Sequence, residues 1–116
     1  MMDSSKPVER LGIKPYNWWN EALHGVARAG LATVFPQPIG MAASFSPETV
    51  YEVFTAVSDE ARAKNAYYAS QGSRERYQGL TMWTPTMNIY RDPRWGRGIE
   101  TYGEAPYLTS RIGVMV

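Results

Sequence analysis

The sequence predicts an α/β fold made of strand–helix units on a parallel sheet. A long amphipathic helical pattern occupies the middle of the 116-residue chain, and short segments rich in β-forming residues lie on either side of it. A second helical pattern follows the last of these segments. Because strands and helices that alternate along a chain pack as βα units, we expect parallel strands covered by helices.

The first 45 residues carry weak structural signals. Residues 1–14 are polar, which predicts a loop with one helical turn, and no signal peptide is expected there because an apolar run is missing. Residues 16–21 are dense in aromatic side chains, and the short apolar stretch 22–26 that follows is of undecided type. Pro36, Pro38 and Gly40 interrupt the next segment, so any strand within residues 31–45 is expected to be short and broken.

The central helix is predicted over residues 47–69. Ser46 is a suitable N-cap, Pro47 suits the first helical position, and Glu48 opposes the positive end of the helix dipole. Apolar residues then recur at helical spacing and define one buried face. They are Val50, Val53, Phe54, Val57, Ala61 and Tyr68.

The last third of the chain predicts a strand, a long loop and a helix. Residues 80–84 are rich in β-forming residues and stop at Pro85. Residues 91–98 contain one proline and two glycines and must form a loop. A helix is expected over residues 106–116, with Ala105 at the N-cap position, where alanine is a poor cap. Two such βα units leave sheet edges unpaired, so we expect self-association or further strands to complete the fold.

Composition excludes several functional classes. Twelve Lys and Arg against eleven Asp and Glu give a net charge of +1, which leaves no basic surface typical of nucleic-acid or membrane binding. No window reaches the ~20 apolar residues of a membrane span. The absence of cysteine removes disulfides and thiolate chemistry, and a single histidine cannot assemble a metal site. We therefore expect no cofactor, no metal, and no nucleic-acid or membrane partner, and the cellular compartment stays open.

Glu21 is the first candidate for ligand binding. It follows Trp18 and Trp19, and aromatic faces beside a carboxylate suit sugars, whose C–H faces pack on rings while their hydroxyls donate to oxygen. The alternative is that the tryptophans are core residues and Glu21 is a capping or solvated residue. Two adjacent side chains on a strand face opposite sides, so both tryptophans cannot lie in one core. His24 is expected to be a hydrogen-bonded structural residue.

The arginine-rich loop is the second candidate. Arg91, Arg94 and Arg97 lie directly after the predicted strand, where guanidinium groups could bind hydroxyls or carboxylates. The alternative is an Arg–Asp network around Asp92 that only orders the loop. Two further carboxylates, Glu100 and Glu104, lie nearby, but sequence spacing does not reveal whether any carboxylate pair has a glycosidase geometry.

Three stretches together resemble one family. Residues 16–26 (YNWWNEALHGV), residues 33–43 (TVFPQPIGMAA) and residues 88–104 (NIYRDPRWGRGIETYGE) are similar, in order and spacing, to the N-terminal portion of the catalytic domain in β-xylosidase and β-glucosidase members of glycoside hydrolase family 3. The resemblance departs from the family pattern at Ala105, where relatives carry Asp, and the family segment that precedes this match is missing.

The resemblance implies a partial (β/α)8 TIM-type barrel, with about two to three βα units, as a fragment of a single N-terminal domain over residues 1–116. It implies retaining, exo-acting hydrolysis of terminal β-linked sugars, with a small oligosaccharide or β-glycoside as substrate. By the match, Glu21 and Arg97 bind the sugar in subsite −1, while Arg91 and Arg94 support the loop. No catalytic residue is expected within this chain, because the Asp nucleophile and the Glu acid/base follow the matched part.

Glu21 in place of the Asp of many β-glucosidases favours a pentose-cleaving member, although the sugar stays open between xylose, arabinose and glucose. The isolated chain is expected to be inactive. Two alternatives stay open: a carbohydrate-binding module that uses the Trp18–Trp19 region and the arginine loop, and a structural or assembly unit without catalytic activity.

Overall fold

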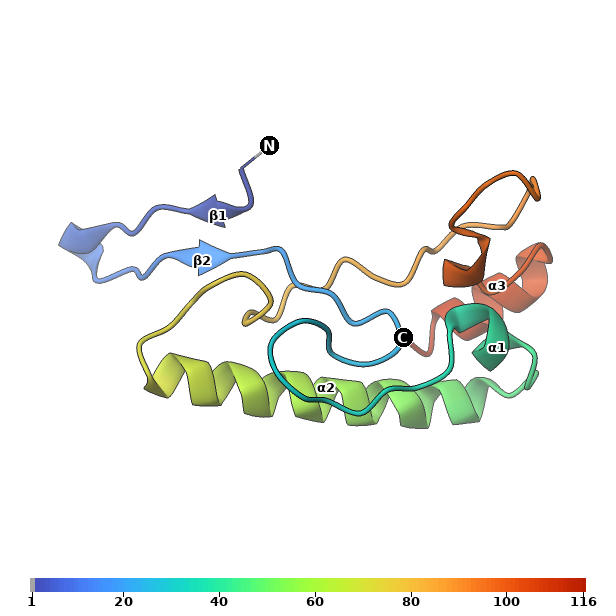
Figure 1. Cartoon of the computed structure of the whole chain (residues 1–116), viewed down its shortest axis with the longest axis horizontal. Coiled ribbons are helices and arrows are strands. Elements are labelled where there is room, and N and C mark those ends of the chain that lie inside the picture. Colours follow the sequence, from blue (N-terminus) through green and yellow to red (C-terminus); the bar gives the residue numbers. More distant parts are fainter. Residues whose placement is uncertain (1) are drawn as a thin grey trace.

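The computed structural model describes residues 2–116 of the chain. The named strands are β1 (Ser4–Ser5) and β2 (Tyr16–Asn17), and the α-helices are α1 (Pro38–Ala42), α2 (Pro47–Ser70) and α3 (Pro106–Gly113). Two 3-10 helices, η1 (Glu9–Leu11) and η2 (Gly98–Glu100), complete the regular elements. Figure 1 shows α2 along the length of the molecule, the β1–β2 pair above one end of it with the turn between the two strands projecting past that end, and α1 and α3 near the other end.

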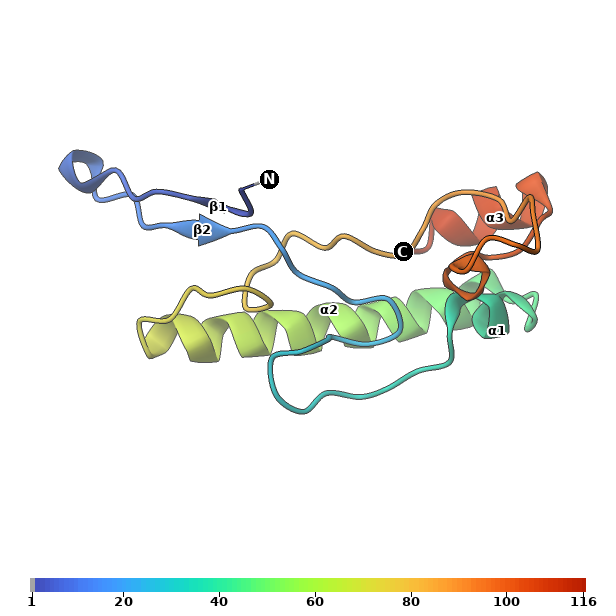
Figure 2. The same ribbon diagram turned by 45° about the horizontal axis from the view of Figure 1, so that its top comes forward.

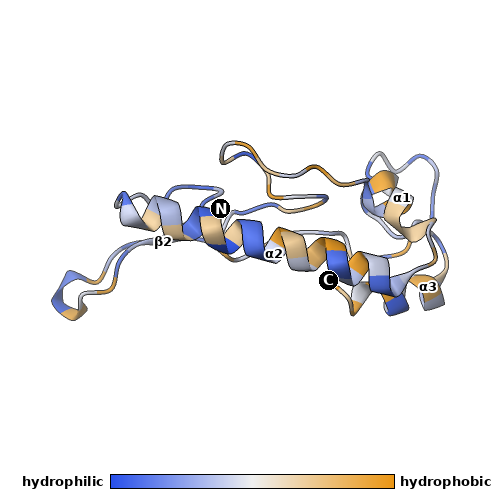
Figure 3. Cartoon of the chain, turned by 90° about the horizontal axis from the view of Figure 1, so that it is seen from below, coloured by the Kyte–Doolittle hydropathy of each residue, from blue (hydrophilic) through white to orange (hydrophobic). Residues whose placement is uncertain are grey.

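Helix α2 confirms the central prediction to within one residue. Ser46 is its N-cap, and its Oγ accepts a hydrogen bond from the Thr49 backbone N–H at 3.2 Å. The predicted apolar face is buried at Val50, Val57 and Ala61, and Phe54 packs against the same core. Seen from below, the helix shows hydrophobic residues interspersed with hydrophilic ones (Figure 3).

The N-terminal segment is more ordered than predicted. The expected helical turn is η1, but β1 and β2 also form an antiparallel pair in which Ser4 lies opposite Asn17. An isolated bridge between Val8 and Ile13 continues this pairing toward η1. No alternating apolar pattern predicts this pair, because it is short and mostly exposed.

The predicted strand over residues 80–84 is wrong as a regular element. It is reduced to a single parallel bridge between Asn20 and Met82, with a hydrogen bond of 2.9 Å from the Trp83 N–H to the Asn20 carbonyl. The physical reason is that the Asn20 side chain accepts from the Gly79 N–H and donates to the Thr81 carbonyl, at 2.7 and 3.0 Å. Backbone groups that a strand partner would bond are thereby taken by one side chain.

Two further boundaries differ from expectation. Residues 38–42 form α1 instead of a broken strand, because Pro38 occupies the first helical position, where its missing N–H costs nothing. Helix α3 begins at Pro106 as predicted, with Ala105 as an N-cap that makes no side-chain bond. It ends at Gly113 rather than Val116, since glycine has low helix propensity. After Gly113 the Met115 N–H donates to the Ile112 carbonyl, three residues back, instead of continuing the α-helical pattern.

Two apolar clusters hold the molecule together. One joins α1, the start of α2 and α3 around the fully buried side chains of Val50, Tyr102 and Ile112. The Tyr102 hydroxyl finds no hydrogen-bond partner among the described residues, and burial raises its pKa. The other cluster packs Ala22 and Val26 on the middle of α2; both lie in residues 18–26, the first extended segment. Figure 2 shows this extended segment alongside α2 from a second direction.

The molecule is elongated rather than compact. Its radius of gyration is 16.1 Å and its extents are 50 × 29 × 22 Å, whereas a compact domain of this length has a radius of about 13 Å. Large apolar side chains remain exposed at Leu31, Val34 and Phe45. Within residues 2–116, the α/β class is therefore met by helices and extended segments but not by a regular parallel sheet.

Candidate sugar-binding site

A cavity of about 850 Å³ is lined by both predicted binding residues. Glu21 contributes from the first extended segment, and Arg97 from the end of the arginine loop, so the fold brings together residues 76 positions apart (97 − 21). Residues 23–34 form much of the wall. The remaining lining residues include Trp19, Trp83, Thr84 and Glu100.

Asn20 places the segment that carries Glu21. It is 1% exposed, and its side chain bonds to backbone groups of Asn17, Gly79 and Thr81. Its own carbonyl accepts from the Trp83 N–H. Asn20 therefore holds residues 18–26 beside residues 79–83 and fixes the backbone position of the adjacent residue, Glu21. The sequence did not predict this role. The available signal was an amide side chain, which can both donate and accept hydrogen bonds, within the aromatic residues 16–21.

The Glu21 carboxylate is half-buried and has two partners, one for each oxygen. Its Oε1 accepts a hydrogen bond of 3.1 Å from the Trp19 indole N–H, and its Oε2 lies 3.2 Å from Arg28 Nε. The Glu21 side chain is 29% exposed, so it lines the cavity and remains accessible to solvent. Arg28 has a left-handed φ of 69°, an uncommon conformation for a residue with a side chain. A carboxylate oxygen has two lone pairs, and each oxygen keeps capacity for a sugar hydroxyl.

Arg97 lies at the cavity beside Glu100. Its Nε donates to Glu100 Oε2 at 3.0 Å. The Glu100 carboxylate raises the pKa of the Arg97 guanidinium, first through this hydrogen bond and then through its charge, and the charge of Glu21 adds to the shift. Gly98 follows because the Tyr90 ring leaves no room for a Cβ, which would lie 2.6 Å from that ring.

The other arginines of the loop are engaged away from this cavity. Arg94 pairs with Asp92 through Nε at 3.0 Å, and its guanidinium lowers the pKa of that carboxyl. Arg91 donates to Asn88 Oδ1 at 2.8 Å. The predicted Asp92 network is thus present at Arg94, whereas the candidate contact with a ligand remains at Arg97. Glu104 is exposed and lies outside the cavity lining.

His24 has the bonding of a structural residue. Its Nδ1 lies 2.7 Å from the Phe35 carbonyl oxygen, and its Nε2 lies 3.2 Å from Gln37 Nε2. The Phe35 N–H in turn donates to the His24 carbonyl at 2.8 Å. These bonds hold Phe35 and Gln37 against the first extended segment, and His24 also lines the cavity. The ring therefore builds the wall of the site.

Trp19 and Trp83 form an aromatic platform at the cavity. Their ring centroids lie 4.8 Å apart with an interplanar angle of 25°, a stacked geometry. Both rings line the cavity, and Trp83 is 44% exposed. The sequence had not singled out Trp83, because it lies 64 residues from Trp19 (83 − 19) in a segment read only as a strand.

Two structural features are absent from the described part of the chain. Residues 2–116 contain no cluster of three or more His, Cys, Asp or Glu side chains that could hold a metal ion. None of the helices described there combines the length and apolar character needed to cross a bilayer.

Comparison with known proteins gives the family. The family model for the "Glycosyl hydrolase family 3 N terminal domain" matches residues 1–116. The chain belongs to this family. In complete members of the family this domain is TIM-barrel-like.

Individual relatives of this family 3 chain are named as xylosidases. It is 53% identical over 118 residues to the xylan 1,4-β-xylosidase of Xylanibacter ruminicola and 45% identical over 121 residues to β-xylosidase/α-L-arabinofuranosidase 2 of Medicago sativa subsp. varia. These alignments cover 100% and 96% of this chain but only 14% and 15% of the relatives. The chain therefore spans about one seventh of their length.

A solved structure shares the arrangement of the chain. The GH3 exo-β-xylosidase XlnD, in complex with a xylobiose aziridine activity-based probe, superposes with a TM-score of 0.78 at 38% identity. The superposition covers 94% of this chain and 14% of that one. The elongated shape and open apolar surfaces therefore belong to a fold that is seen within a much larger enzyme.

Proposed function

We propose that this chain is the sugar-binding N-terminal part of a retaining, exo-acting β-glycosidase of the β-xylosidase type. It contributes Glu21 and Arg97 to subsite −1, while the nucleophile and the acid/base lie outside these 116 residues. The observation that carries the proposal is the convergence of Glu21 and Arg97 on one cavity beside stacked tryptophans. Glu21 and Arg97, the two residues that the sequence predicts to contact sugar, thus line one cavity, and this cavity is large enough for a monosaccharide.

The chemistry of the cavity suits a neutral sugar. Glu21 offers acceptor oxygens to hydroxyl groups, Arg97 offers guanidinium donors, and an indole face packs on pyranose C–H groups. Glu21 and Glu100 each pair with an arginine, an arrangement that suits hydrogen-bond acceptors rather than proton donors. In our proposal these groups bind and orient the terminal sugar, and the bond-breaking carboxylates come from elsewhere in the protein.

The finer fold is part of the same proposal. The parallel bridge between Asn20 and Met82 and the packing of both extended segments on α2 support two to three βα units of a (β/α)8 barrel. In such a barrel, ligand-binding residues follow the strands. Glu21 directly follows the bridge residue Asn20, and Arg97 lies in the long loop after Met82, which agrees with that rule.

The substrate is proposed to be a short β-linked xylo-oligosaccharide or an aryl β-xyloside. The relatives named as β-xylosidases and the probe-bound neighbour support a pentose. Where a β-glucoside is hydrolysed as well, the ratio of the two kcat/KM values gives the preference.

The test is hydrolysis of aryl β-xyloside by the gene product that contains this chain, compared with the pure 116-residue chain. We expect turnover by the gene product with retention of the anomeric configuration, and none by the isolated chain, because removal of the nucleophile and acid/base removes most of the rate enhancement. Turnover by the isolated chain above a Glu21→Ala control would refute the division of roles. Sugar binding by a gene product without turnover would favour the carbohydrate-binding alternative.

A further inference from the structure

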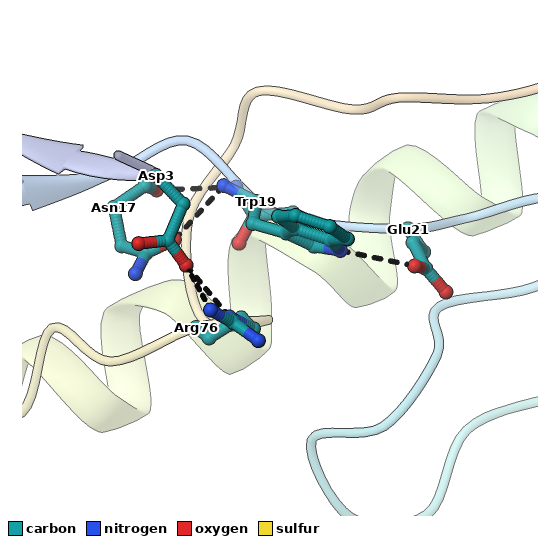
Figure 4. A network of polar contacts seen from close by, with 6 residues as sticks. Asp3, Asn17, Trp19, Glu21 and Arg76 are labelled. Carbon is teal, nitrogen blue, oxygen red and sulfur yellow. Dashed lines mark hydrogen bonds and ion pairs between the residues drawn. The ribbon is translucent and has the colours of Figure 1, made fainter. Parts of the chain in front are cut away.

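Trp19 is held by contacts to its ring, to its backbone and to its indole N–H. One face stacks on Trp83, and the guanidinium of Arg76 lies over the ring, 4.8 Å from its centroid. Its backbone N–H donates to Asn17 Oδ1 at 2.9 Å, and its carbonyl accepts from the Tyr77 N–H at 2.9 Å. The remaining polar edge, the indole N–H, donates to Glu21 (Figure 4).

Arg76 is in turn fixed by Asp3. Its Nε donates to Asp3 Oδ2 at 2.7 Å, and its Nη2 pairs with the same oxygen. The Asp3 carbonyl accepts from the Trp18 N–H at 2.9 Å, which ties the N-terminal segment to the backbone beside Trp19. Figure 4 shows the resulting chain of contacts from Asp3 through Arg76 and Trp19 to Glu21. Neither Asp3 nor Arg76 lines the cavity.

We propose that Asp3 and Arg76 are positioning residues that fix the Trp19 indole and, through its N–H, the orientation of the Glu21 carboxylate. The proposal rests on the proposed role of Glu21. A carboxylate with a free side chain samples several rotamers, and a donor in a fixed position selects the one in which Oε1 faces the indole. The other oxygen, Oε2, then lies beside Arg28 at the cavity, 3.2 Å from its Nε.

Stability alone does not explain this arrangement. Arg76 keeps 49% of its side-chain exposure, and exposed ion pairs contribute little to folding. The pair joins residues 73 positions apart, so it is not the local helix pairing seen between Asp59 and Arg62. Its geometric effect is to hold a cation over an aromatic ring that contacts the proposed binding carboxylate.

The test uses the gene product and aryl β-xyloside. Arg76→Ala should lower kcat/KM by about 3- to 10-fold, within the range of coupling between residues of one network. Asp3→Asn should have a smaller effect in the same direction, and Arg76→Lys should recover part of the loss because it keeps the cation. Arg62→Ala, which breaks a comparable exposed ion pair on α2, is the matched control and should leave kcat/KM unchanged.

A double-mutant cycle separates positioning from general structure. In the Glu21→Gln background, Arg76→Ala should change kcat/KM by less than about 2-fold, because the group it orients is already altered. An equal loss in both backgrounds, or no loss in either, would overturn the proposal.

Near-ultraviolet circular dichroism provides a readout that is independent of activity. Arg76→Ala should reduce the aromatic signal of the stacked Trp19–Trp83 pair, and Arg62→Ala should not. If Glu21→Gln leaves kcat/KM unchanged, the proposed function of Glu21 fails. The positioning of Trp19 by Arg76 is then supported by a reduced signal and refuted by an unchanged one.

Discussion

Replacing Asn20 by alanine should destabilise the protein more than the small size of the asparagine side chain implies. The side chain is almost fully buried and bonds to three backbone groups, the carbonyls of Asn17 and Thr81 and the N–H of Gly79. Alanine leaves all three without that partner. The two extended segments that carry Glu21 and Trp83 would then be joined by the backbone bond between Trp83 and Asn20, by the hydrogen bonds of the Tyr16 hydroxyl to Leu80 and Thr81, and by packing.

The magnitude follows from these contacts. Each neutral hydrogen bond contributes about 1 kcal/mol net, and a donor left buried without a partner costs more. Thr81 is exposed and Asn17 half-buried, so water replaces part of what their carbonyls lose. We expect a loss of about 2–3 kcal/mol in the free energy of unfolding.

Asn65 offers a matched control. It lies on α2 and makes one side-chain hydrogen bond, from its Nδ2 to the carbonyl of Gln78 at 2.7 Å. Gln78 is the residue before Gly79, which Asn20 binds. Asn65→Ala loses about 1 kcal/mol of bonding but gains roughly half of that in helix propensity, so it should be nearly neutral.

Urea denaturation of the gene product, together with hydrogen exchange at the Trp83 amide, measures the effect. Faster exchange at Trp83 in Asn20→Ala, but not in Asn65→Ala, is the expected pattern. A loss below about 0.5 kcal/mol for Asn20→Ala would refute the role assigned to this side chain.

Three further predictions concern single features. Gly25 has a φ of 122°, and a Cβ there would lie 2.1 Å from the Thr33 carbonyl oxygen, so Gly25→Ala should cost about 2 kcal/mol or more, against about 1 kcal/mol for Gly12→Ala in open space. Equal shifts in denaturation midpoint would contradict the steric argument. Hydrogen bonds from Thr33 lower the pKa of Glu60 from its ordinary 4.5. This contact therefore stabilises the protein above that pH and is lost as the pH falls through the lower folded value. The Thr33 amide shift should titrate below pH 4.5, and a midpoint above that value would disprove the assignment. Finally, light scattering should show that the isolated chain self-associates at micromolar concentration, because its apolar surfaces lack partners. A compact monomer with slowly exchanging amides across residues 80–84 would show that these surfaces are sufficient.

The sequence predicted the parts of the fold that depend on local signals. Helix α2 was predictable because Ser46 and Pro47 mark its start and the apolar face repeats at helical spacing. The start of α3 at Pro106 was predictable for the same reason. The helix at Pro38 was missed because proline was read as a breaker, although proline also begins helices.

The strand prediction failed for a non-local reason. Residues 80–84 have the composition of a strand, but the Asn20 side chain, 60 positions away from residue 80 (80 − 20), takes backbone groups that a ladder would use. No local pattern contains that information. Likewise, Trp83 and Arg76 gained their roles only when the chain brought them against Trp19.

The candidate site divides in the same way. Glu21 and Arg97 were chosen from residue type and from resemblance to glycoside hydrolase family 3, and the structure places both on one cavity. Their contact with sugar stays a prediction. Residue type alone could not separate Arg94 from Arg97, because both are arginines in one loop, and only the family resemblance gave them different roles. In the structure Arg97 lines the cavity and pairs with Glu100, whereas Arg94 lies outside the lining and pairs with Asp92.

The most direct measurement of the central claim is kcat/KM of the gene product on aryl β-xyloside after Glu21→Ala. We predict a reduction of about 100-fold, because a charge-assisted hydrogen bond contributes about 1.5–3 kcal/mol and strengthens toward the transition state. Glu104→Ala, which removes an exposed carboxylate outside the cavity, should leave kcat/KM unchanged. Unaltered kinetics in a folded Glu21→Ala protein would contradict the account and make Glu21 a structural partner of Trp19 and Arg28.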